Sequence, residues 1–559
     1  MLARVKIIRF GQALLKTKTK LEPYCKFPEA IHDLSYYSTR AGECLKRGEE
    51  WKIPEGGISS KEMGYVKKGL THQGLVVSII DKNKASLCVL CPVMLHRVLV
   101  KMYPVGETYE KVEETEEQVL NRMVESSVNV FKDIMGVDIT RKKEGKVIPF
   151  EKKMRDKMME LPKAYAFPKE KDLQKGRPIV PYRKHGLRRE LQCAAKALLY
   201  IMEKLQDEGE LKTYTLRTCT DIGRRILGWN ETVNELEQST GEKKGMILRM
   251  YDVKNMFTAL PRDQILKAVD ELFEMTKGKK WGRNNDKRLV VVPKLKADRS
   301  RLMRIVTSRA TVDPEIHFAF TFKQIREVLV WDMEHVYFMV GDTVLKQVNG
   351  LPMGSPPSPV LANLTCGLGY EMEYINRLET AEGERIWGIR SMDDVVIAST
   401  YKAGDDESQE RAVERLSELK YHDSMVLERT DDDTAEWQRY LEGEIGISEY
   451  RMTLRFFNVN SVSLLENGTC IKPRAQSGAS YIPMSYRRSY IYGALNRMKG
   501  YGLEPAQMQL LAGRHLIMEL KAEGWSGLKK IILGAGEHIL DGGVREILAE
   551  EAGRKTITE

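Results

Sequence analysis

The sequence predicts an α+β protein built from several subdomains. At 559 residues the chain is too long for one ordinary hydrophobic core. Strand-like runs and helical patterns follow one another along it, without an internal repeat. Apolar residues make up 42% of the chain and charged residues 30%, which is typical of a globular protein and excludes a largely disordered one.

The N-terminal part begins with a basic segment. The first 21 residues contain six Lys or Arg residues and no acid. An uncleaved basic arm is the simple interpretation, and a mitochondrial presequence is the alternative. Farther along, residues 74–80 have the pattern of a strand and residues 113–135 that of a helix. No run approaches the roughly 20 apolar residues that a membrane helix needs, so we expect no contact with a membrane.

The eight cysteines are scattered, which favours a reducing, intracellular compartment over a disulfide framework. Only Cys88 and Cys91 have the spacing of a metal-binding pair, with His96 as the nearest further ligand. No second pair follows at zinc-finger spacing, and the run around them is apolar. We therefore expect a buried strand here rather than a zinc site.

The middle of the chain offers clearer elements. After a basic linker at residues 141–146, apolar spacing predicts a helix over 186–207, a strand over 245–252 and an amphipathic helix over about 263–275. The segment 277–309 carries twelve Lys or Arg residues against two Asp, and is either a solvated loop or an insertion that grips a nucleic-acid backbone. The last 75 residues are expected to form short helices separated by Gly turns.

The overall charge favours a polyanionic partner without requiring one. Lys and Arg number 89 against 79 Asp and Glu. Such a surplus suits nucleic acid, because each neutralised phosphate releases a condensed counterion. Many soluble proteins carry a similar surplus, so the argument depends on the motifs.

Three segments together predict a catalytic site. The first is an apolar strand that ends in Asp252, with an aromatic residue five positions later. The second is the Gly- and Pro-rich segment 347–363. The third places Asp393 and Asp394 directly before a run of β-branched residues. Each feature alone is commonplace, but their combination in this order is specific.

Carboxylates in these places suit phosphoryl transfer. Two Mg²⁺ ions roughly 3.5–4 Å apart can clamp the attacking and leaving oxygens, and such hard cations prefer carboxylate oxygens. Asp252 at a strand end and Asp393 at the turn of a neighbouring hairpin would bridge both ions, and Asp394 would assist more weakly. We therefore expect two Mg²⁺ ions, with Mn²⁺ as a substitute.

The second segment has the chemistry of a tight turn that leads into a helix. Gly350 and Gly354 lack a Cβ, so this turn would bring backbone amides close to a base pair. Ser358 and Pro359 then begin a helix, with Pro at the first helical position, where it is favoured.

At these residues the sequence resembles reverse transcriptases, and within them it is most similar to the Penelope-like retroelements, which are akin to telomerase. Asp252 and Phe257 look like motif A, residues 351–359 like motif B, and residues 391–394 like motif C. Weaker similarities lie in the stretches 79–84, 108–109, 161–169, 176–180, 440–445 and 487–500.

The resemblance implies an RNA-directed DNA polymerase with a right-hand fold. Its expected parts are an N-terminal extension over 1–140 as a candidate RNA-binding region, fingers over 141–245, a palm with an antiparallel sheet over 246–460 that includes the basic insertion 277–309, and a helical thumb over 461–559. Its expected partners are template RNA, a DNA primer and dNTPs, and its expected compartment is the nucleus, with the mitochondrion as the alternative.

The resemblance also implies roles for individual residues. The implied metal-binding positions are Asp252, Val253, Asp393 and Asp394. The implied nucleotide-binding positions are Lys169 and Arg177 for the triphosphate, and Phe257, Gln347, Met353 and Gly354 around the nascent base pair. Lys420 is a candidate general acid for pyrophosphate. The simpler alternatives are a solvated surface pair for Lys169 and Arg177, and an exposed helix lysine for Lys420.

Position 257 bears on the choice of sugar. An aromatic ring there would lie under the sugar and clash with a 2′-hydroxyl, which favours deoxynucleotides; a packed core phenylalanine is the alternative. An RNA-copying RNA polymerase is disfavoured by Phe257 and by the Pro-rich second segment. A catalytically silent nucleic-acid-binding protein is disfavoured because all three aspartates are present.

One feature of many Penelope-like proteins is missing from the pattern. Nothing after Arg514 offers the residues of a GIY-YIG endonuclease, so we expect a member without this domain. The Tyr-Ile-Tyr run at 490–492 lies within the thumb-like segment, where we expect it to pack in a core.

Overall fold

The structure is a computed structural model. It describes residues 76–81, 83–90, 92–135, 150–169, 172–282, 287–294, 303–314, 316–378, 384–467, 470, 474–475, 484–498 and 505–554. The basic arm, the linker at 141–146 and Cys91 lie outside the described residues. Helices are mixed with sheets whose named strands all pair antiparallel in this part of the chain. The predicted α+β class is thereby confirmed. Within the same residues, no helix is both long enough and apolar enough to cross a membrane.

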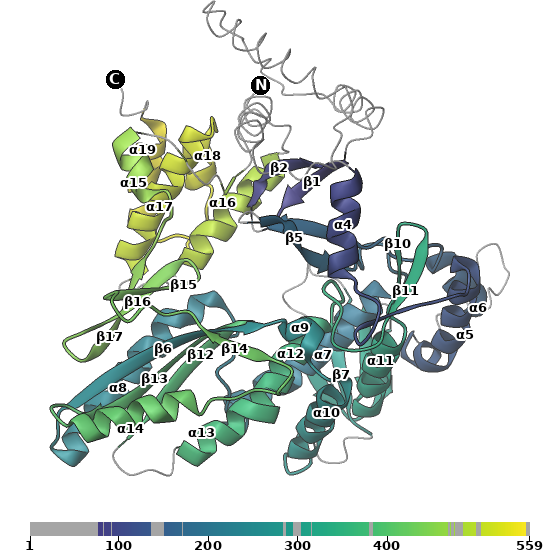
Figure 1. Cartoon of the computed structure of the whole chain (residues 1–559), viewed down its shortest axis with the longest axis horizontal. Helices are drawn as coiled ribbons and strands as arrows, with labels where there is room; N and C mark the ends of the chain where they lie inside the picture. Colours follow the sequence, from purple (N-terminus) through teal and green to yellow (C-terminus); the bar gives the residue numbers. More distant parts are fainter. Residues whose placement is uncertain are drawn as a thin grey trace, which may run out of the picture.

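A first unit contains two hairpins and one helix (Figure 1). Its elements are β1 (Val76–Ile80), β2 (Asn83–Leu90), α4 (Pro92–Met102), β4 (Tyr165–Lys169) and β5 (Asp172–Ile179). The Asp81 amide donates to the Pro168 carbonyl over 2.8 Å, which joins the two hairpins. Residues 83–90 do form the expected strand, although the environment of Cys88 lies outside the described side chains.

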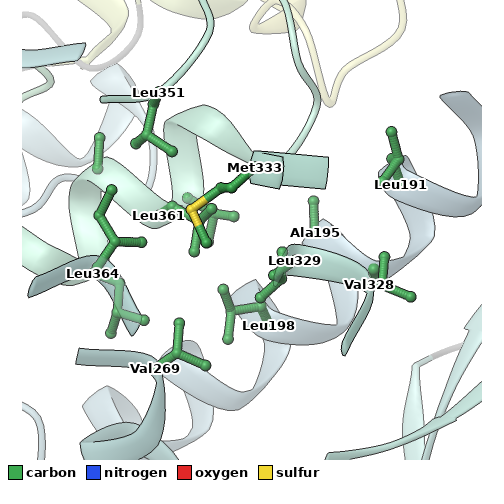
Figure 2. Close-up of a cluster of buried hydrophobic side chains, with 14 of the residues drawn as sticks. Leu191, Ala195, Leu198, Val269, Val328, Leu329, Met333, Leu351, Leu361 and Leu364 are labelled. Carbon is green, nitrogen blue, oxygen red and sulfur yellow. The ribbon is translucent and has the colours of Figure 1, made fainter. Parts of the chain in front are cut away.

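A large core joins the helices on the right of Figure 1. The helices around it are α5 (Glu116–Met135), α6 (Phe150–Lys157), α7 (Arg188–Asp207), α9 (Met256–Ala259), α10 (Arg262–Thr276), α11 (Phe322–Glu334) and α12 (Ser358–Cys366). Figure 2 shows Leu198 of α7, Val269 of α10, Leu329 of α11 and Leu361 of α12 meeting in this core. The predicted helices at 186–207 and 263–275 are confirmed, because their apolar spacing places one stripe against the core.

Two small sheets border this core. One sheet contains β3 (Tyr109–Lys111), β10 (Tyr337–Val340) and β11 (Thr343–Gln347). The other contains β7 (Leu289–Pro293), β8 (Arg304–Val306) and β9 (His317–Thr321), with a short helix, Arg309–Thr311, between β8 and β9. The described part of the basic segment 277–309 thus contains a buried strand, β7, and not only a solvated loop. Beside it, the Lys294 ammonium lies 4.6 Å from the ring centroid of Phe318.

A four-stranded sheet occupies the lower left of Figure 1, in the order β12-β13-β6-β14. Its strands are β6 (Lys244–Lys254), β12 (Ile386–Ser391), β13 (Asp394–Lys402) and β14 (Val426–Arg429). Because side chains alternate along a strand, Val395 and Ile397 join the large core, whereas Val396 and Ala398 face a second cluster. Both faces of this sheet are therefore buried, which accounts for the continuous apolar runs in the sequences of β6 and β13.

The sheet is covered on both sides. Helices α13 (Met372–Leu378) and α14 (Asp406–Ser417) cover one face. The other face is covered by helix α8 (Ile222–Thr240) and by a sheet of β15 (Trp437–Tyr440), β16 (Gly443–Ser448) and β17 (Arg451–Phe456). A short helix, Cys219–Asp221, precedes α8. The predicted boundary at 245 therefore separates α8 from the sheet that it covers. Asn230 of α8 fixes this contact, since its amide bonds both the N–H and the carbonyl of Met452.

The C-terminal helices have their own core. They are α15 (Ser461–Asn467), α16 (Met484–Met498), α17 (Pro505–Ala522), α18 (Leu528–Leu533) and α19 (Gly542–Gly553). The expectation of short helices divided by Gly turns is wrong for α17, which continues through Gly513. A Cβ at Gly513 would lie 2.3 Å from a methyl group of Leu548, so this glycine allows α19 to approach α17 closely. In the 490–492 run, Ile491 is buried and the Tyr492 hydroxyl donates to the Ile531 carbonyl over 2.9 Å.

Candidate active site

The centre of the four-stranded sheet brings the predicted aspartates together. Asp252 ends the apolar part of β6, and Asp394, the first residue of β13, is its direct register partner. The amide of Val253 donates to the Asp393 carbonyl over 2.8 Å, which draws the turn against β6. Because opposed residues on neighbouring strands point to the same face, the carboxylates of Asp252 and Asp394 share one face. Segments distant in the sequence therefore meet, but the residue opposite Asp252 is Asp394, which was expected to assist more weakly, and Asp393 lies in the turn.

The turn between β12 and β13 is tight. Ser391 pairs with Asp394, so Met392 and Asp393 alone form the loop. Met392 has φ +59°, a left-handed conformation that a residue with a side chain seldom adopts. Such conformations persist only where surrounding contacts hold them, and they concentrate at functional sites.

A third carboxylate lies on the other side of Asp252. Glu428 of β14 is the register partner of Asp252 on that side. The Lys254 ammonium contacts Asp252 Oδ2 and lies 2.7 Å from Glu428 Oε2. Its hydrogen bonds to Asp252 and then to Glu428 raise the pKa of Lys254 above the ordinary lysine value. The side chain of Lys254 thus bridges the carboxylates of Asp252 and Glu428.

The side chains at these positions are of the type that binds a divalent cation, but they do not converge on one point. Carboxylate oxygens are the ligands that Mg²⁺ prefers, and Asp252, Asp394 and Glu428 offer them from adjacent strands. Within the described residues, however, no three His, Cys, Asp or Glu side chains already converge on one point. In this structure the Lys254 ammonium contacts Asp252 at that place. The sequence analysis missed Glu428, because an acid in a short exposed strand is too common to be a signal.

The glycine-rich turn packs against the helix that carries Phe257. Gly350 has φ +66°, and a Cβ there would lie 2.6 Å from the carbonyl oxygens of both Phe257 and Thr258. The amide of Leu351 donates to the Phe257 carbonyl over 2.6 Å. The close approach expected of this glycine is therefore found, but its neighbour in the structure is protein backbone. The ring of Phe257 is partly buried against the large core.

Gly354 makes a second close contact, with the first unit. A Cβ at Gly354 would lie 2.0 Å from the Val180 carbonyl oxygen, and the Val180 amide donates to the Met353 carbonyl over 3.0 Å. Val180 directly follows β5, the strand that carries Arg177. The turn thus connects the segment of Phe257 to that of Arg177. Helix α12 begins at Ser358 as predicted, but Pro359 is its second residue and not its first.

Gln347 lies beneath this turn and is only 1% exposed. Its side-chain amide donates to the Asn349 carbonyl over 2.8 Å, and Oε1 has no hydrogen-bond partner among the described residues. The Arg262 guanidinium donates to the carbonyls of Gln347 and Gly350, over 2.7 and 3.3 Å. Arg262, which the sequence analysis did not single out, therefore supports both ends of the turn.

A buried acid anchors the far side of the turn. Asp332 of α11 accepts a hydrogen bond of 2.6 Å from the Ser355 hydroxyl and is 3% exposed. Burial raises the pKa of Asp332 to about 6, although Ser355, Tyr182 and Arg262 act in the opposite direction. Sequence reasoning could not find this contact, because an aspartate in an amphipathic helix is ordinarily exposed.

The remaining predicted residues, Lys169, Arg177 and Lys420, make no described contact with Asp252. Lys169 is exposed at the end of β4, and the Arg177 side chain lies 3.4 Å from Asp81. Lys420 is exposed in the loop after α14, not within a helix, although the next residue, Tyr421, is buried. No hydrogen bond or ion pair among the described contacts joins Lys169 or Lys420 to Asp252. Their assigned roles remain predictions.

Comparisons with known proteins give distant likenesses. No protein family and no curated protein matches the chain. Among solved structures, telomerase from Candida albicans in complex with a TWJ fragment of telomeric RNA shares 12% identity over 95% of this chain and 79% of its own, with a TM-score of 0.46. Apo telomerase from Candida tropicalis shares 12% identity over 93% of this chain and 76% of its own, with a TM-score of 0.45. A form of it truncated from its C-terminal domain shares 11% identity over 70% of this chain and 66% of its own, with a TM-score of 0.43. With such identities and with TM-scores below 0.5, these likenesses assign no family.

Proposed function

We propose that this chain is an RNA-directed DNA polymerase, which transfers nucleotides from dNTPs to the 3′-hydroxyl of a DNA primer on an RNA template. The observation that carries the proposal is the register of the sheet: Asp252 and Asp394 are opposed on β6 and β13, with Asp393 in the turn that Val253 holds. Three carboxylates from two distant segments thereby lie at the same end of two neighbouring strands, and two-metal phosphoryl transfer requires such a cluster.

The carboxylates of Asp252, Asp393 and Asp394 would hold Mg²⁺, with Val253 as a further position of the implied metal site. When bound, two Mg²⁺ ions would neutralise the charge of the triphosphate and of the leaving pyrophosphate. The chain's own task is to hold these side chains at fixed places on the sheet. Lys254 would then remain beside Glu428, and Lys169 and Arg177 would contact the phosphates from the first unit.

The choice of deoxynucleotides rests on Phe257. Its backbone carbonyl accepts the hydrogen bond from Leu351, and its ring is partly buried against the large core. In the proposed site the ring excludes a 2′-hydroxyl, and Gln347, Met353 and Gly354 would border the nascent base pair. This arrangement favours a DNA polymerase over an RNA-copying RNA polymerase.

The proposal extends to the origin of the chain. Motifs like those of the Penelope-like branch favour a retroelement protein that acts in the nucleus. The net charge of +10 suits template RNA and a DNA primer.

One observation favours a second candidate, a catalytically silent protein that binds nucleic acid. Lys254 occupies a cation position at Asp252, and the described residues contain no preassembled metal site. If Lys254 cannot be displaced, the chain would bind primer and template without extending the primer.

The deciding experiment is primer extension by the purified full-length protein. A labelled DNA primer on an RNA template is incubated with dNTPs or rNTPs, and with Mg²⁺ or Mn²⁺. We expect extension with dNTPs, and no extension by Asp393→Asn, which should bind primer–template as wild type does.

Asp342→Asn is the matched control, because Asp342 lies in the tight turn between β10 and β11 and not in the four-stranded sheet that carries Asp252. It should extend primers as wild type does. Extension by Asp393→Asn would refute the metal role, and binding without extension by wild type would support the silent alternative.

A further inference from the structure

Behind the aspartate turn lies an ion pair that is completely buried. The guanidinium of Arg390 and the carboxylate of Glu371 are each 0% exposed, with 2.5 Å between Nε and Oε1. Removing two charges from water is costly, and apolar residues of similar volume often replace such a pair without loss of stability. A contribution to stability alone therefore does not account for this pair.

Glu371 connects two further segments. Besides Arg390, its carboxylate accepts hydrogen bonds from the Thr213 hydroxyl (2.6 Å), the Tyr214 amide (2.9 Å) and the Tyr421 hydroxyl (2.8 Å). Burial alone would raise the pKa of Glu371, but Arg390 and these hydrogen bonds hold it below the ordinary value. Glu371 ends a π-helical turn, Gly367–Glu371, after α12, and such turns are frequent at functional sites.

Arg390 uses its remaining donors on both sides of the turn. Nη1 donates to Asn363 Oδ1 of α12 (2.8 Å) and to the Met392 carbonyl (3.2 Å). Nη2 donates to the Thr215 hydroxyl (2.7 Å) and to the Asn363 carbonyl (3.2 Å). One planar guanidinium thus joins α12 to the left-handed residue that precedes Asp393.

We propose that Arg390 and Glu371 form a positioning element for the turn that carries Asp393. By holding the Met392 carbonyl against α12, Arg390 keeps a strained backbone in the conformation that places Asp393 and Asp394 beside Asp252. Through Tyr421, Glu371 also fixes the loop that presents Lys420. The inference rests on the proposed polymerase function, and it adds residues that touch neither metal nor substrate.

The test separates positioning from stability by a double substitution. Arg390→Met alone leaves a buried charge unpaired and should be strongly destabilised, as should Glu371→Leu alone. The double variant Arg390→Met/Glu371→Leu removes both charges, so its Tm should lie above those of the single variants, although the buried groups of Thr213, Thr215 and Tyr421 lose their hydrogen bonds to the pair. Because a displacement of about 1 Å at a catalytic group can cost roughly 100-fold, its kcat for primer extension should fall by about that factor, with KM for dNTP little changed.

Metal binding supplies a readout that needs no turnover. The rise of Tm with Mg²⁺ concentration reports binding to the folded state. In the double variant this rise should require about tenfold more Mg²⁺, because the displaced Asp393 binds the ion less well; one decade corresponds to about 1.4 kcal/mol. Lys157→Met/Glu190→Leu removes another ion pair, of 2.7 Å, on α6 and α7, and should leave kcat and the Mg²⁺ response unchanged.

Arg390→Lys serves if the double variant does not fold. It retains the positive charge beside Glu371, but a single ammonium cannot reach Asn363, Thr215 and the Met392 carbonyl together. It should therefore fold and show the same loss of kcat and the same weaker response to Mg²⁺.

The inference is overturned if a folded variant, the double or Arg390→Lys, keeps kcat and the Mg²⁺ response within about twofold of wild type, less than 0.5 kcal/mol. If wild type extends no primer, the polymerase proposal fails by itself, and the Mg²⁺ dependence of Tm still decides whether Arg390 positions the turn.

Discussion

The amide of Leu351 donates a hydrogen bond of 2.6 Å to the carbonyl of Phe257, and so joins the glycine-rich turn to α9. The contact depends on Gly350, which precedes Leu351 in a left-handed conformation with no room for a Cβ. A turn and a helix distant in sequence are thereby fixed at backbone level, where only glycine fits.

Gly350→Ala should therefore be more destabilising than its backbone conformation alone requires. Gly341→Ala is the matched control, because Gly341 has φ +61° but no atom lies within 4 Å of its Cβ position. The control should cost about 1–2 kcal/mol for the left-handed backbone, and Gly350→Ala about 1–3 kcal/mol more for overpacking. Urea unfolding of both variants measures the difference. Equal losses would mean that the turn relaxes away from Phe257 without cost.

Phe257→Val should increase the incorporation of ribonucleotides. The smaller side chain removes the proposed clash with the 2′-hydroxyl, and a lost steric contact of about 1–3 kcal/mol corresponds to a change of about 5- to 150-fold in the dNTP:rNTP preference. Single-nucleotide kinetics give the ratio. Phe457→Val, at a partly buried ring beside Arg439, is the control. An unchanged ratio would show that Phe257 only packs in the core.

Lys254→Met should make the protein bind Mg²⁺ more tightly. The ammonium competes for Asp252 and Glu428 but is partly exposed, and exposed ion pairs contribute at most about 1 kcal/mol, so the gain should not exceed about fivefold. The Mg²⁺ concentration that half-maximally raises Tm measures it. Lys402 of β13 forms a comparable pair, 2.8 Å from Glu242, and Lys402→Met should leave Mg²⁺ binding unchanged. Weaker Mg²⁺ binding in Lys254→Met would contradict the idea that Lys254 occupies a cation position.

Asp332→Asn should flatten the dependence of stability on pH. The pKa of Asp332 is raised from 3.8 to about 6 in the folded protein, so the folded state binds this proton more tightly than the unfolded state. Stability should therefore fall as pH rises from about 4 to about 6, by about 3 kcal/mol for two pKa units, and stay lower above that range.

In Asp332→Asn the side chain is neutral at every pH and can still accept the hydrogen bond from Ser355. The variant should match wild type near pH 4 and exceed it near pH 7.5. Urea unfolding across this range, with Asp342→Asn as an exposed control, tests the prediction. A variant with the wild-type slope would assign the pH dependence to other groups.

Local patterns in the sequence were sufficient for single elements. The helix at Arg188–Asp207 and the strand at Lys244–Lys254 follow from apolar spacing. In each segment the apolar residues recur with the period of that secondary structure. The same reasoning failed at Gly513, where contact with Leu548, and not local preference, decides that the helix continues. It also could not show that α8 covers the sheet, since an amphipathic helix does not state what it packs against.

By itself, the sequence determined which residues could perform the chemistry: Asp252 at the end of an apolar strand, the pair Asp393 and Asp394 before another, and a glycine-rich turn between them. Only the tertiary structure decided the register that sets Asp394 opposite Asp252, the place of Lys254 and Glu428 beside them, and the buried contact of Arg390 with Glu371 behind the turn. Spacing along a chain fixes which side chains share a face of one element, whereas partners across elements depend on strand register and on the burial of charges, which exist only once the chain has packed.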